Sequence, residues 1–333
     1  MSILKINNLR TEFETKGGIV KAIRDVSLHV DEGEMVGIVG ESGSGKTCTM
    51  LSLMGLLAGN GHVRQGEFWY KGENISPLAF SDPHQYEKKM RSIRSKEIAM
   101  IFQDPMTFLN PVLSIRKQLT EPLKLHFGYS QQKADKRAIE LMQLVGIPSP
   151  EKRLRQYPFE FSGGMRQRII IAIALSCNPK LVIADEPTTA LDVTIQAQVL
   201  ELIKKLQQET GTSVIMITHD LGVIATTCTR VIVMYGGQIV EEGTNFEIFG
   251  KPKHPYTLGL LNSINNPEED TKALIPIPGS PPDLLAPPAG CPFVDRCTYA
   301  MRICVSHQPP CCIYSDTHRS CCWLEHPLAK EAR

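Results

Sequence analysis

The pattern of apolar positions predicts buried parallel strands near three places in the chain. The apolar runs at residues 35–40, 181–185 and 213–219 are not interrupted by alternating polar residues. Unbroken runs of this length are typical of parallel strands that are covered on both faces. In contrast, "VSLHV" at 26–30 alternates apolar and polar residues, and "ILKI" at 3–6 is compatible with a strand too. The sequence therefore also predicts a small antiparallel sheet near its start.

Helical periodicity is clearest between two of these runs. In residues 196–209 the apolar side chains recur at i, i+3, i+4 and i+7, and Gly211 follows the last turn. This spacing predicts one amphipathic helix that packs a single stripe against the core. Residues 103–176 look mainly helical and contain no obvious strand, so we expect a helical subdomain there.

A change of composition near Ile264 divides the chain. Seven prolines fall between Pro276 and Pro292, which favours an extended connection over a helix. We therefore expect a main domain of residues 1–264, with its helical subdomain at about 103–176, followed by a Pro- and Cys-rich region of residues 265–333.

Charge and hydropathy narrow the class of protein. The 333 residues carry a formal net charge of +1 without a basic block, which gives no support to a nucleic-acid partner. The longest apolar run, residues 169–175, is far shorter than the ~18–20 residues that cross a bilayer. The first residues also lack the pattern of a secretory signal. We expect a protein that stays in the cytoplasm and binds no nucleic acid.

A phosphate-binding loop is the first chemical motif. "GESGSGKT" at residues 40–47 follows a predicted buried strand and matches G-x-x-x-x-G-K-[ST]. The glycines let successive N–H groups point at phosphate, the lysine brings charge to the β and γ phosphates, and the threonine offers a hydroxyl to magnesium. The predicted nucleotide-binding residues here are Gly40, Glu41, Ser42, Gly43, Ser44, Gly45, Lys46 and Thr47.

Two carboxylates and a histidine follow the other predicted strands. "LVIADEP" places Asp185 and Glu186 at the end of an apolar run, and His219 follows the run "VIMIT". By themselves the carboxylates could cap a helix and the histidine could be structural. Beside a phosphate loop, we interpret Asp185 as holding magnesium and Glu186 as the base that polarises the attacking water.

A second phosphate-binding helix start is predicted at "FSGGMRQR", residues 161–168. Ser162, Gly163 and Gly164 lead directly into a long apolar run, so a helix begins there with little side-chain bulk to exclude an anion. This segment resembles the signature motif of ABC-type ATPases. Phe161 and Met165 depart from the usual leucine and glutamine, and Met165 cannot donate the hydrogen bonds of an amide.

The order of motifs strengthens this resemblance. Phosphate loop, "FQDP", signature, "ADEP", "ALD" and "THD" follow one another as in that family. The resemblance implies an α/β fold: a P-loop NTPase core with an antiparallel β subdomain and an α-helical subdomain. It also implies that ATP and Mg²⁺ bind and that each ATP is clamped between the phosphate loop of one subunit and the signature of another. The roles implied are catalysis by Glu186, His219 and Gln103, magnesium binding by Thr47, Gln103 and Asp185, and nucleotide binding by Phe13, Ser162, Gly163, Gly164, Met165 and Asp192.

The C-terminal sequence indicates one branch of this family. "HPYTLGLL" at 254–261 and the Pro- and Cys-rich sequence from residue 277 onward resemble the C-terminal region of oligopeptide and dipeptide importer ATPases. The resemblance implies a peripheral motor subunit at the cytoplasmic face of the membrane. Its implied partners are a second ATPase subunit (a copy of this chain or a related one), two integral-membrane permeases and an extracytoplasmic substrate-binding protein. A nickel or metal-complex importer and a soluble ABC regulator remain alternatives to a peptide importer.

The cysteines are concentrated in this region, with seven of the ten between Cys291 and Cys322. A reducing cytosol disfavours disulfides among them. The ATPases that the chain resembles carry a Cys-rich C-terminal extension that holds a [4Fe–4S] cluster. The matching residues are Cys291, Cys297, Cys304 and Cys322, with Cys321 as an alternative fourth ligand. Zn²⁺ is the alternative metal, although short zinc sites normally contain a C-x-x-C pair.

Overall fold

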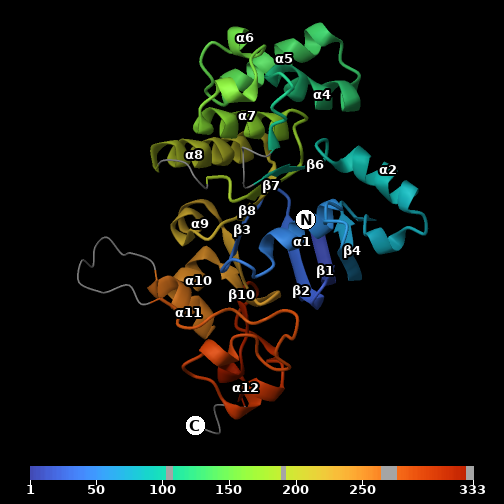
Figure 1. Cartoon of the computed structure of the whole chain (residues 1–333). Coiled ribbons are helices and arrows are strands. Elements are labelled where there is room, and N and C mark those ends of the chain that lie inside the picture. The colour runs from blue at the N-terminus through green and yellow to red at the C-terminus, as the bar shows by residue number, and fades with distance from the viewer. Residues whose placement is uncertain (103–107, 189–192, 264–275, 328–333) are drawn as a thin grey trace. The chain divides into compact units, whose positions relative to one another are not determined.

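The computed structural model describes residues 1–102, 108–188, 193–263 and 276–327 (Figure 1). The chain forms two compact units. One, the central unit, contains Asp82–Ile217 and the short segment Asp31–Glu34. The other, the flanking unit, contains Ser2–Val30, Met35–Ser81 and Thr218–Arg333. Each is described by itself. Predicted residues Gln103 and Asp192 lie outside the described ranges.

The first sheet of the flanking unit is the antiparallel sheet that the sequence predicts. Its order is β2-β1-β4-β5, and β1 pairs with β4 from Leu4 opposite Tyr70 to Phe13 opposite Gly61. The strands are longer than the alternating pattern indicates, because "VSLHV" and "ILKI" are only the parts that alternate clearly. Their bounds are β1 Ser2–Thr15, β2 Gly18–Asp31, β4 Gly61–Tyr70 and β5 Glu73–Asn74.

A second set of strands in the flanking unit supports the phosphate loop. The predicted strand β3 is completely buried and pairs in parallel with β9, which sequence analysis missed. Strands β10, β12 and β11 continue from β9 by antiparallel pairing. The last two strands therefore join the C-terminal region to the strands beside the loop. The bounds are β3 Met35–Val39, β9 Arg230–Tyr235, β10 Gln238–Thr244, β11 Cys311–Ile313 and β12 Arg319–Cys321.

Short helices complete the flanking unit. Figure 1 shows the tail, as we call residues 276–327, in orange to red beside α10 and α11. The helices are α1 Lys46–Met54, η1 Pro77–Ala79, α9 Leu221–Thr227, α10 Asn245–Gly250, α11 Pro255–Asn262, η3 Val294–Arg296, α12 Arg302–Ser306 and η4 Trp323–Glu325.

The central unit contains three parallel strands and most of the long helices. Strand β7 lies between β6 and β8, and every residue of the three strands is buried, as the unbroken apolar runs predict for β7 and β8. On α8, Val199, Ile203 and Leu206 form the predicted buried stripe. The bounds are β6 Ile98–Ile101, β7 Leu181–Asp185, β8 Ser213–Ile217, α2 Pro83–Ile93, α4 Ile115–Phe127, α5 Gln131–Leu144, α6 Pro150–Arg153, η2 Pro158–Glu160, α7 Gly163–Leu175 and α8 Val193–Thr210.

The elements described between residues 108 and 176 are all helical, and Figure 1 shows α4 to α7 gathered together. Ser114 and Ser130 cap α4 and α5 by accepting backbone N–H bonds, and Arg116 on α4 pairs with Asp135 on α5. No helix in the described ranges is both long and apolar enough to cross a bilayer. The domain limit near Ile264 and the limits of the helical subdomain stay predictions.

Candidate functional site

The phosphate loop runs from the end of β3 to the first residue of α1. Gly43 and Gly45 have φ of 77° and 103°, the left-handed region that glycine adopts without steric cost. Lys46 is 6% exposed, and its Nζ donates to the carbonyl oxygens of Gly40 at 2.7 Å and Glu41 at 2.9 Å. A buried ammonium at a helix start is the arrangement that binds phosphate groups.

Glu41 in this loop is held by residues far along the chain. Its backbone N–H donates to Tyr256 Oη at 2.8 Å. Its carboxylate accepts two hydrogen bonds from the Arg296 guanidinium, at 2.6 and 2.9 Å. Because the amide and the carboxylate both have protein partners, Glu41 acts as an attachment point of the loop. Its predicted contact with nucleotide stays a prediction.

The "HPY" sequence explains how Tyr256 reaches the loop. His254 caps α11, and its Nδ1 accepts the N–H of Tyr256 at 3.0 Å. Complete burial lowers the pKa of His254 to about 3, so the ring is neutral and Nδ1 can accept. The backbone N–H of His254 in turn donates to the buried Glu241 carboxylate at 3.0 Å. This chain of bonds fixes the first turn of α11 and with it the fully buried Tyr256.

Arg296 attaches the tail to the same place. Besides Glu41, its guanidinium donates to Tyr235 Oη at 3.0 Å and to the carbonyls of Pro278 at 2.8 Å and Ile277 at 3.1 Å. The ring of Phe293 packs 5.2 Å from Tyr235 and 5.3 Å from Tyr256, measured between centroids. Sequence analysis missed Arg296, Tyr235 and Tyr256. The signals that could have found them are an arginine inside a cysteine-rich segment and the "HPY" sequence.

The two predicted carboxylates lie in the central unit, at the end of β7. Asp185 is the last strand residue and is 2% exposed. Glu186 is half-buried, has φ of 44°, and donates its N–H to Ile217 O at 2.8 Å. Positive φ is uncommon for a residue with a side chain, and strain of this kind collects at functional sites. The next helix in the described part of the chain is α8, which starts at Val193, so neither carboxylate directly precedes a described helix.

The signature segment forms the predicted helix start. Ser162 caps α7 and is exposed, its Oγ accepts the N–H of Met165 at 3.4 Å, and the space where a Gly163 side chain would lie is open. Phe161, which stands where the family usually has leucine, is 3% exposed and so remains an apolar core residue. Sequence analysis missed one contact here, a 2.6 Å hydrogen bond from Gln167 Nε2 to Pro187 O.

The remaining predicted residues have clear positions. Phe13 lies on β1, half-exposed, with its ring over Gly61, where any Cβ would come within 2.6 Å of it. His219 is exposed and directly precedes Asp220, the N-cap of α9. Thr47 lies in the flanking unit and Asp185 in the central unit, so their joint binding of magnesium stays a prediction.

Comparisons with known proteins agree with these motifs. The family model "ABC transporter" matches residues 23–189, and "Oligopeptide/dipeptide transporter, C-terminal region" matches residues 240–304. The chain is 54% identical over 329 residues to the oligopeptide transport ATP-binding protein OppD of Bacillus subtilis (strain 168), covering 98% of this chain and 90% of that one. It is 50% identical over 331 residues to the dipeptide transport ATP-binding protein DppD of the same organism, covering 99% and 97%. This chain belongs to the oligopeptide/dipeptide branch of the ABC transporter family.

Solved structures place the fold in the same family. The dimeric ATP-binding cassette MJ0796 in a post-hydrolysis state, bound to ADP and Pi, has a TM-score of 0.64 at 29% identity, covering 73% of this chain and 98% of that one. The expected ABC ATPase cassette with mixed α and β structure is therefore confirmed. As a member of this family, the chain is an ATP-hydrolysing subunit of a transporter.

The family resemblance also implies a metal cluster, and the tail has suitable donors. Cys291, Cys304 and Cys322 are buried and Cys297 is half-buried. Burial, with a smaller contribution from the charges of the other three thiols, raises the pKa of Cys322 to about 12. Four such thiols can be deprotonated together only beside strong positive charge, which metal ions supply. Within the described ranges, however, no group of three or more His, Cys, Asp or Glu residues has the arrangement of a metal-ion site.

The expectation that disulfides are absent is wrong for one pair. Cys311 on β11 and Cys321 on β12 lie opposite each other in register and form a disulfide. Antiparallel pairing brings the two sulfur atoms together, and the argument from a reducing compartment could not foresee this. The pairing of Cys321 leaves Cys322 as the free thiol beside Cys291, Cys297 and Cys304.

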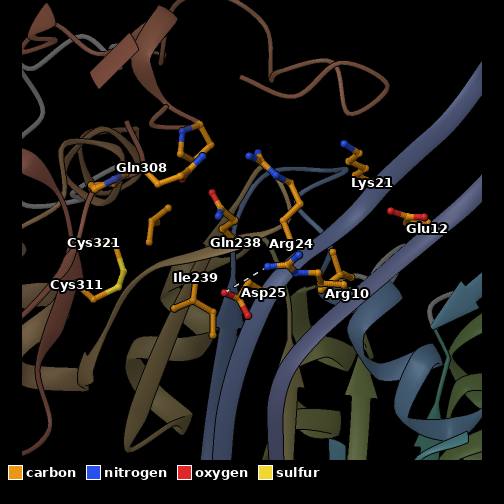
Figure 2. A pocket seen from close by; sticks show the side chains of 14 residues that line it. Arg10, Glu12, Lys21, Arg24, Asp25, Gln238, Ile239, Gln308, Cys311 and Cys321 are labelled. Carbon is orange, nitrogen blue, oxygen red and sulfur yellow. Dashed lines mark ion pairs between the residues drawn. A yellow bond between two sulfur atoms is a disulfide. The ribbon is translucent and has the colours of Figure 1, made fainter. Parts of the chain in front are cut away.

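A pocket of about 480 Å³ lies where the tail meets β1 and β2. Figure 2 shows the Cys311–Cys321 disulfide on one side of this pocket and Arg24 and Lys21 on the other. Arg24 Nη2 donates to Pro288 O at 3.2 Å, and Lys21 N donates to Leu284 O at 2.9 Å. The tail is therefore joined to β2 as well as to the phosphate loop.

Proposed function

We propose that this chain is the motor subunit of an importer for di- or oligopeptides. The observation that carries the proposal is the tail. Its first part lies within the match to the C-terminal region of oligopeptide/dipeptide transporters, and it is attached to the phosphate loop through Arg296. Relatives named for oligopeptides and dipeptides cover nearly the whole chain, which favours peptides over nickel or metal complexes as cargo.

Lys46, Asp185 and Glu186 have distinct roles in the proposed ATPase cycle. Lys46 binds the β and γ phosphates as a point charge. Asp185 helps to hold Mg²⁺, together with Thr47 and Gln103. Glu186 accepts the proton of the attacking water, and its positive φ supports this role because a strained backbone is kept where it directs a side chain.

The ATP site is completed by a second subunit, either a copy of this chain or a related ATPase. The exposed N-terminus of α7 supports this proposal, because Ser162 and Gly163 leave the helix start open to an anion. In the assembled pair, the signature of one subunit covers the phosphates held by the loop of the other. ATP binding thus closes the pair and moves the attached permeases, and hydrolysis reopens the pair.

Two permeases, at the cytoplasmic face of the membrane, and an external substrate-binding protein complete the proposed assembly. Large apolar side chains are exposed in the helical part of the central unit: Val112 is 76%, Leu125 74% and Phe159 69% exposed. Large apolar side chains exposed on one subdomain are compatible with a protein–protein interface. We place the permease contact there.

The tail is proposed to bind a [4Fe–4S] cluster through Cys291, Cys297, Cys304 and Cys322. These four residues contain no C-x-x-C pair, which short zinc sites normally use, and their wide spacing in the sequence suits a loop around a larger cluster. The iron ions of the cluster would supply the positive charge that holds these four thiolates together. Anaerobically purified protein is expected to be brown and to contain iron and sulfide in equal amounts. Zinc without iron would contradict the assignment.

One experiment tests the transport function. A tagged form of this chain is purified from membranes, its co-purifying proteins are identified, and the complex is reconstituted in lipid vesicles. We expect polytopic permeases to co-purify and peptides, delivered by the binding protein, to accelerate ATP hydrolysis. A matched complex with Glu186→Gln should assemble but not import. Stimulation by a nickel complex instead of peptides, or purification without any membrane protein, would overturn the proposal.

A further inference from the structure

The bond between Arg296 and Glu41 joins two positions that are 255 residues apart in the chain. Glu41 is the second residue of the phosphate loop, and Arg296 directly precedes Cys297 in the tail. The arginine side chain is 5% exposed and the glutamate side chain 27% exposed. Both nitrogen termini of the guanidinium contact the carboxylate, in the bidentate geometry that fixes orientation as well as distance.

Glu41 brings a negative charge into a loop that binds a polyanion. An unpaired carboxylate there would repel the phosphates of ATP, because like charges at short distance and partial burial are weakly screened. Arg296 compensates this charge. It also limits where the glutamate can lie, because its remaining donors are held by Tyr235 and by two tail carbonyls.

The same residue sets the position of the loop lysine. Glu41 makes hydrogen bonds at three points. Its backbone N–H donates to Tyr256, its carbonyl oxygen accepts from Lys46, and its carboxylate accepts from Arg296. A shift of Glu41 therefore moves the carbonyl that Lys46 holds. The geometry of the phosphate loop depends in this way on contacts made by the tail.

We propose that Arg296 is a positioning residue of the nucleotide site, so that tight ATP binding requires the folded tail. This inference rests on nucleotide binding at residues 40–47, and it goes beyond the transport function by making the cysteine-rich segment part of the ATP site. Arg296 ends the short helix η3, and the residues just before this helix are held by the bonds from Cys291 N to Cys304 O at 2.8 Å and from Val294 N to Cys291 O at 3.2 Å. Loss of order around these cysteines withdraws the guanidinium from Glu41. Linkage makes the effect reciprocal, so bound nucleotide also stabilises the tail.

The test measures equilibrium binding of a fluorescent MgATP analogue to the full chain. Arg296→Ala should bind about tenfold more weakly, the change expected when one charge near the phosphates is no longer compensated. Arg302→Ala, which removes an exposed arginine six residues further along the tail, is the matched control and should bind like the wild type. Arg296→Lys keeps the charge but not the bidentate contact, so its loss should be smaller than that of Arg296→Ala.

A second substitution separates positioning from simple loss of structure. If Arg296 acts through Glu41, neutralising that carboxylate should recover affinity in the variant that lacks the arginine. The double variant Arg296→Ala/Glu41→Gln should therefore bind more tightly than Arg296→Ala alone. No recovery, or wild-type affinity in Arg296→Ala, would overturn the inference.

If Arg296→Ala does not fold, the inference can be tested by measuring how fast a cysteine in the tail is alkylated. Glu41→Gln leaves the tail sequence intact but weakens its attachment, so iodoacetamide should alkylate the half-buried Cys297 faster than in the wild type. MgATP should slow the wild-type reaction. Peptide mass spectrometry follows each cysteine separately. Equal rates in both proteins, or no effect of MgATP, would also overturn the inference, whereas a wild type that binds no ATP would overturn the nucleotide site itself.

Discussion

Replacement of Gly290 by alanine is expected to release the cysteine segment of the tail. A Cβ at this position would lie 2.0 Å from Cys304 O and 2.7 Å from both the carbonyl carbon and the oxygen of Val305. Ordinary carbon–oxygen contacts are about 3.3–3.6 Å, and all three atoms belong to the backbone, so no side-chain rotation relieves the overlap. The two chain segments must separate by more than about 1 Å.

The cost follows from the contacts that this separation breaks. The bonds from Cys291 N to Cys304 O at 2.8 Å and from Gln308 Nε2 to Gly290 O at 2.6 Å would be lost. Each contributes about 0.5–1.5 kcal/mol, and forced overpacking adds about 1–3 kcal/mol. We therefore expect the tail to lose about 3 kcal/mol of stability.

Two measurements check this expectation. Alkylation of Cys291 and Cys304, followed by peptide mass spectrometry, should become much faster, and limited proteolysis should begin in the tail. Gly250→Ala is the matched control, because a Cβ at that position would meet nothing within 4 Å and the φ of Gly250 is not positive. Unchanged alkylation rates in Gly290→Ala would refute the reasoning from steric overlap.

Three further outcomes are expected. Glu186→Gln should lower single-turnover hydrolysis by about 10²–10⁴-fold while MgATP binding persists; normal hydrolysis would contradict the role of this base. Tyr256→Phe removes the acceptor of the Glu41 N–H, a loss of about 1 kcal/mol, so MgATP affinity in equilibrium titrations should fall about fivefold, and equal affinity would argue against loop support. Burial lowers the pKa of His254 from 6.5 to about 3, so the unfolded chain binds the extra proton and stability falls as pH drops below about 6.5. Urea unfolding at pH 7 and 5.5 should show about 1 kcal/mol of this loss, and His254→Asn, which can still cap α11, should not show it.

Local patterns in the sequence were sufficient to predict the central buried strands and the phosphate-binding motif. Strands β7 and β8 are buried on both faces, so their apolar runs are unbroken, and the chemistry of phosphate binding requires glycines and a lysine at fixed spacing. Strands β11 and β12 are only three residues long, Cys-Cys-Ile and Arg-Ser-Cys, and are too short to show an apolar run or a regular alternation. Their pairing is set by tertiary contacts, which no local periodicity records.

The support of the phosphate loop could not be predicted for the same reason. Glu41 and Arg296 meet only because β9, α11 and the tail pack together, and neither residue has a sequence neighbour that indicates the other. Likewise, counting cysteines could not show that Cys311 and Cys321 lie opposite each other on adjacent strands. Spacing along the chain describes short-range structure, whereas these pairs depend on the complete fold of the flanking unit.

The pairing of β12 with β10 has a consequence for solubility. Glu241 is 0% exposed and Glu242 4% exposed, and the tail supplies one partner to each, in addition to the His254 N–H on Glu241 and Arg230 on Glu242: His318 Nε2 lies 2.9 Å from Glu241, and Arg319 Nε donates to Glu242 at 2.7 Å. A chain cut near residue 264 would lose both tail partners and uncover the hydrogen-bonding edge of β10. Unpaired strand edges recruit other strands. By covering the edge of β10, the tail is expected to prevent edge-to-edge aggregation. A shortened chain should therefore self-associate even though its nucleotide-binding motifs are intact.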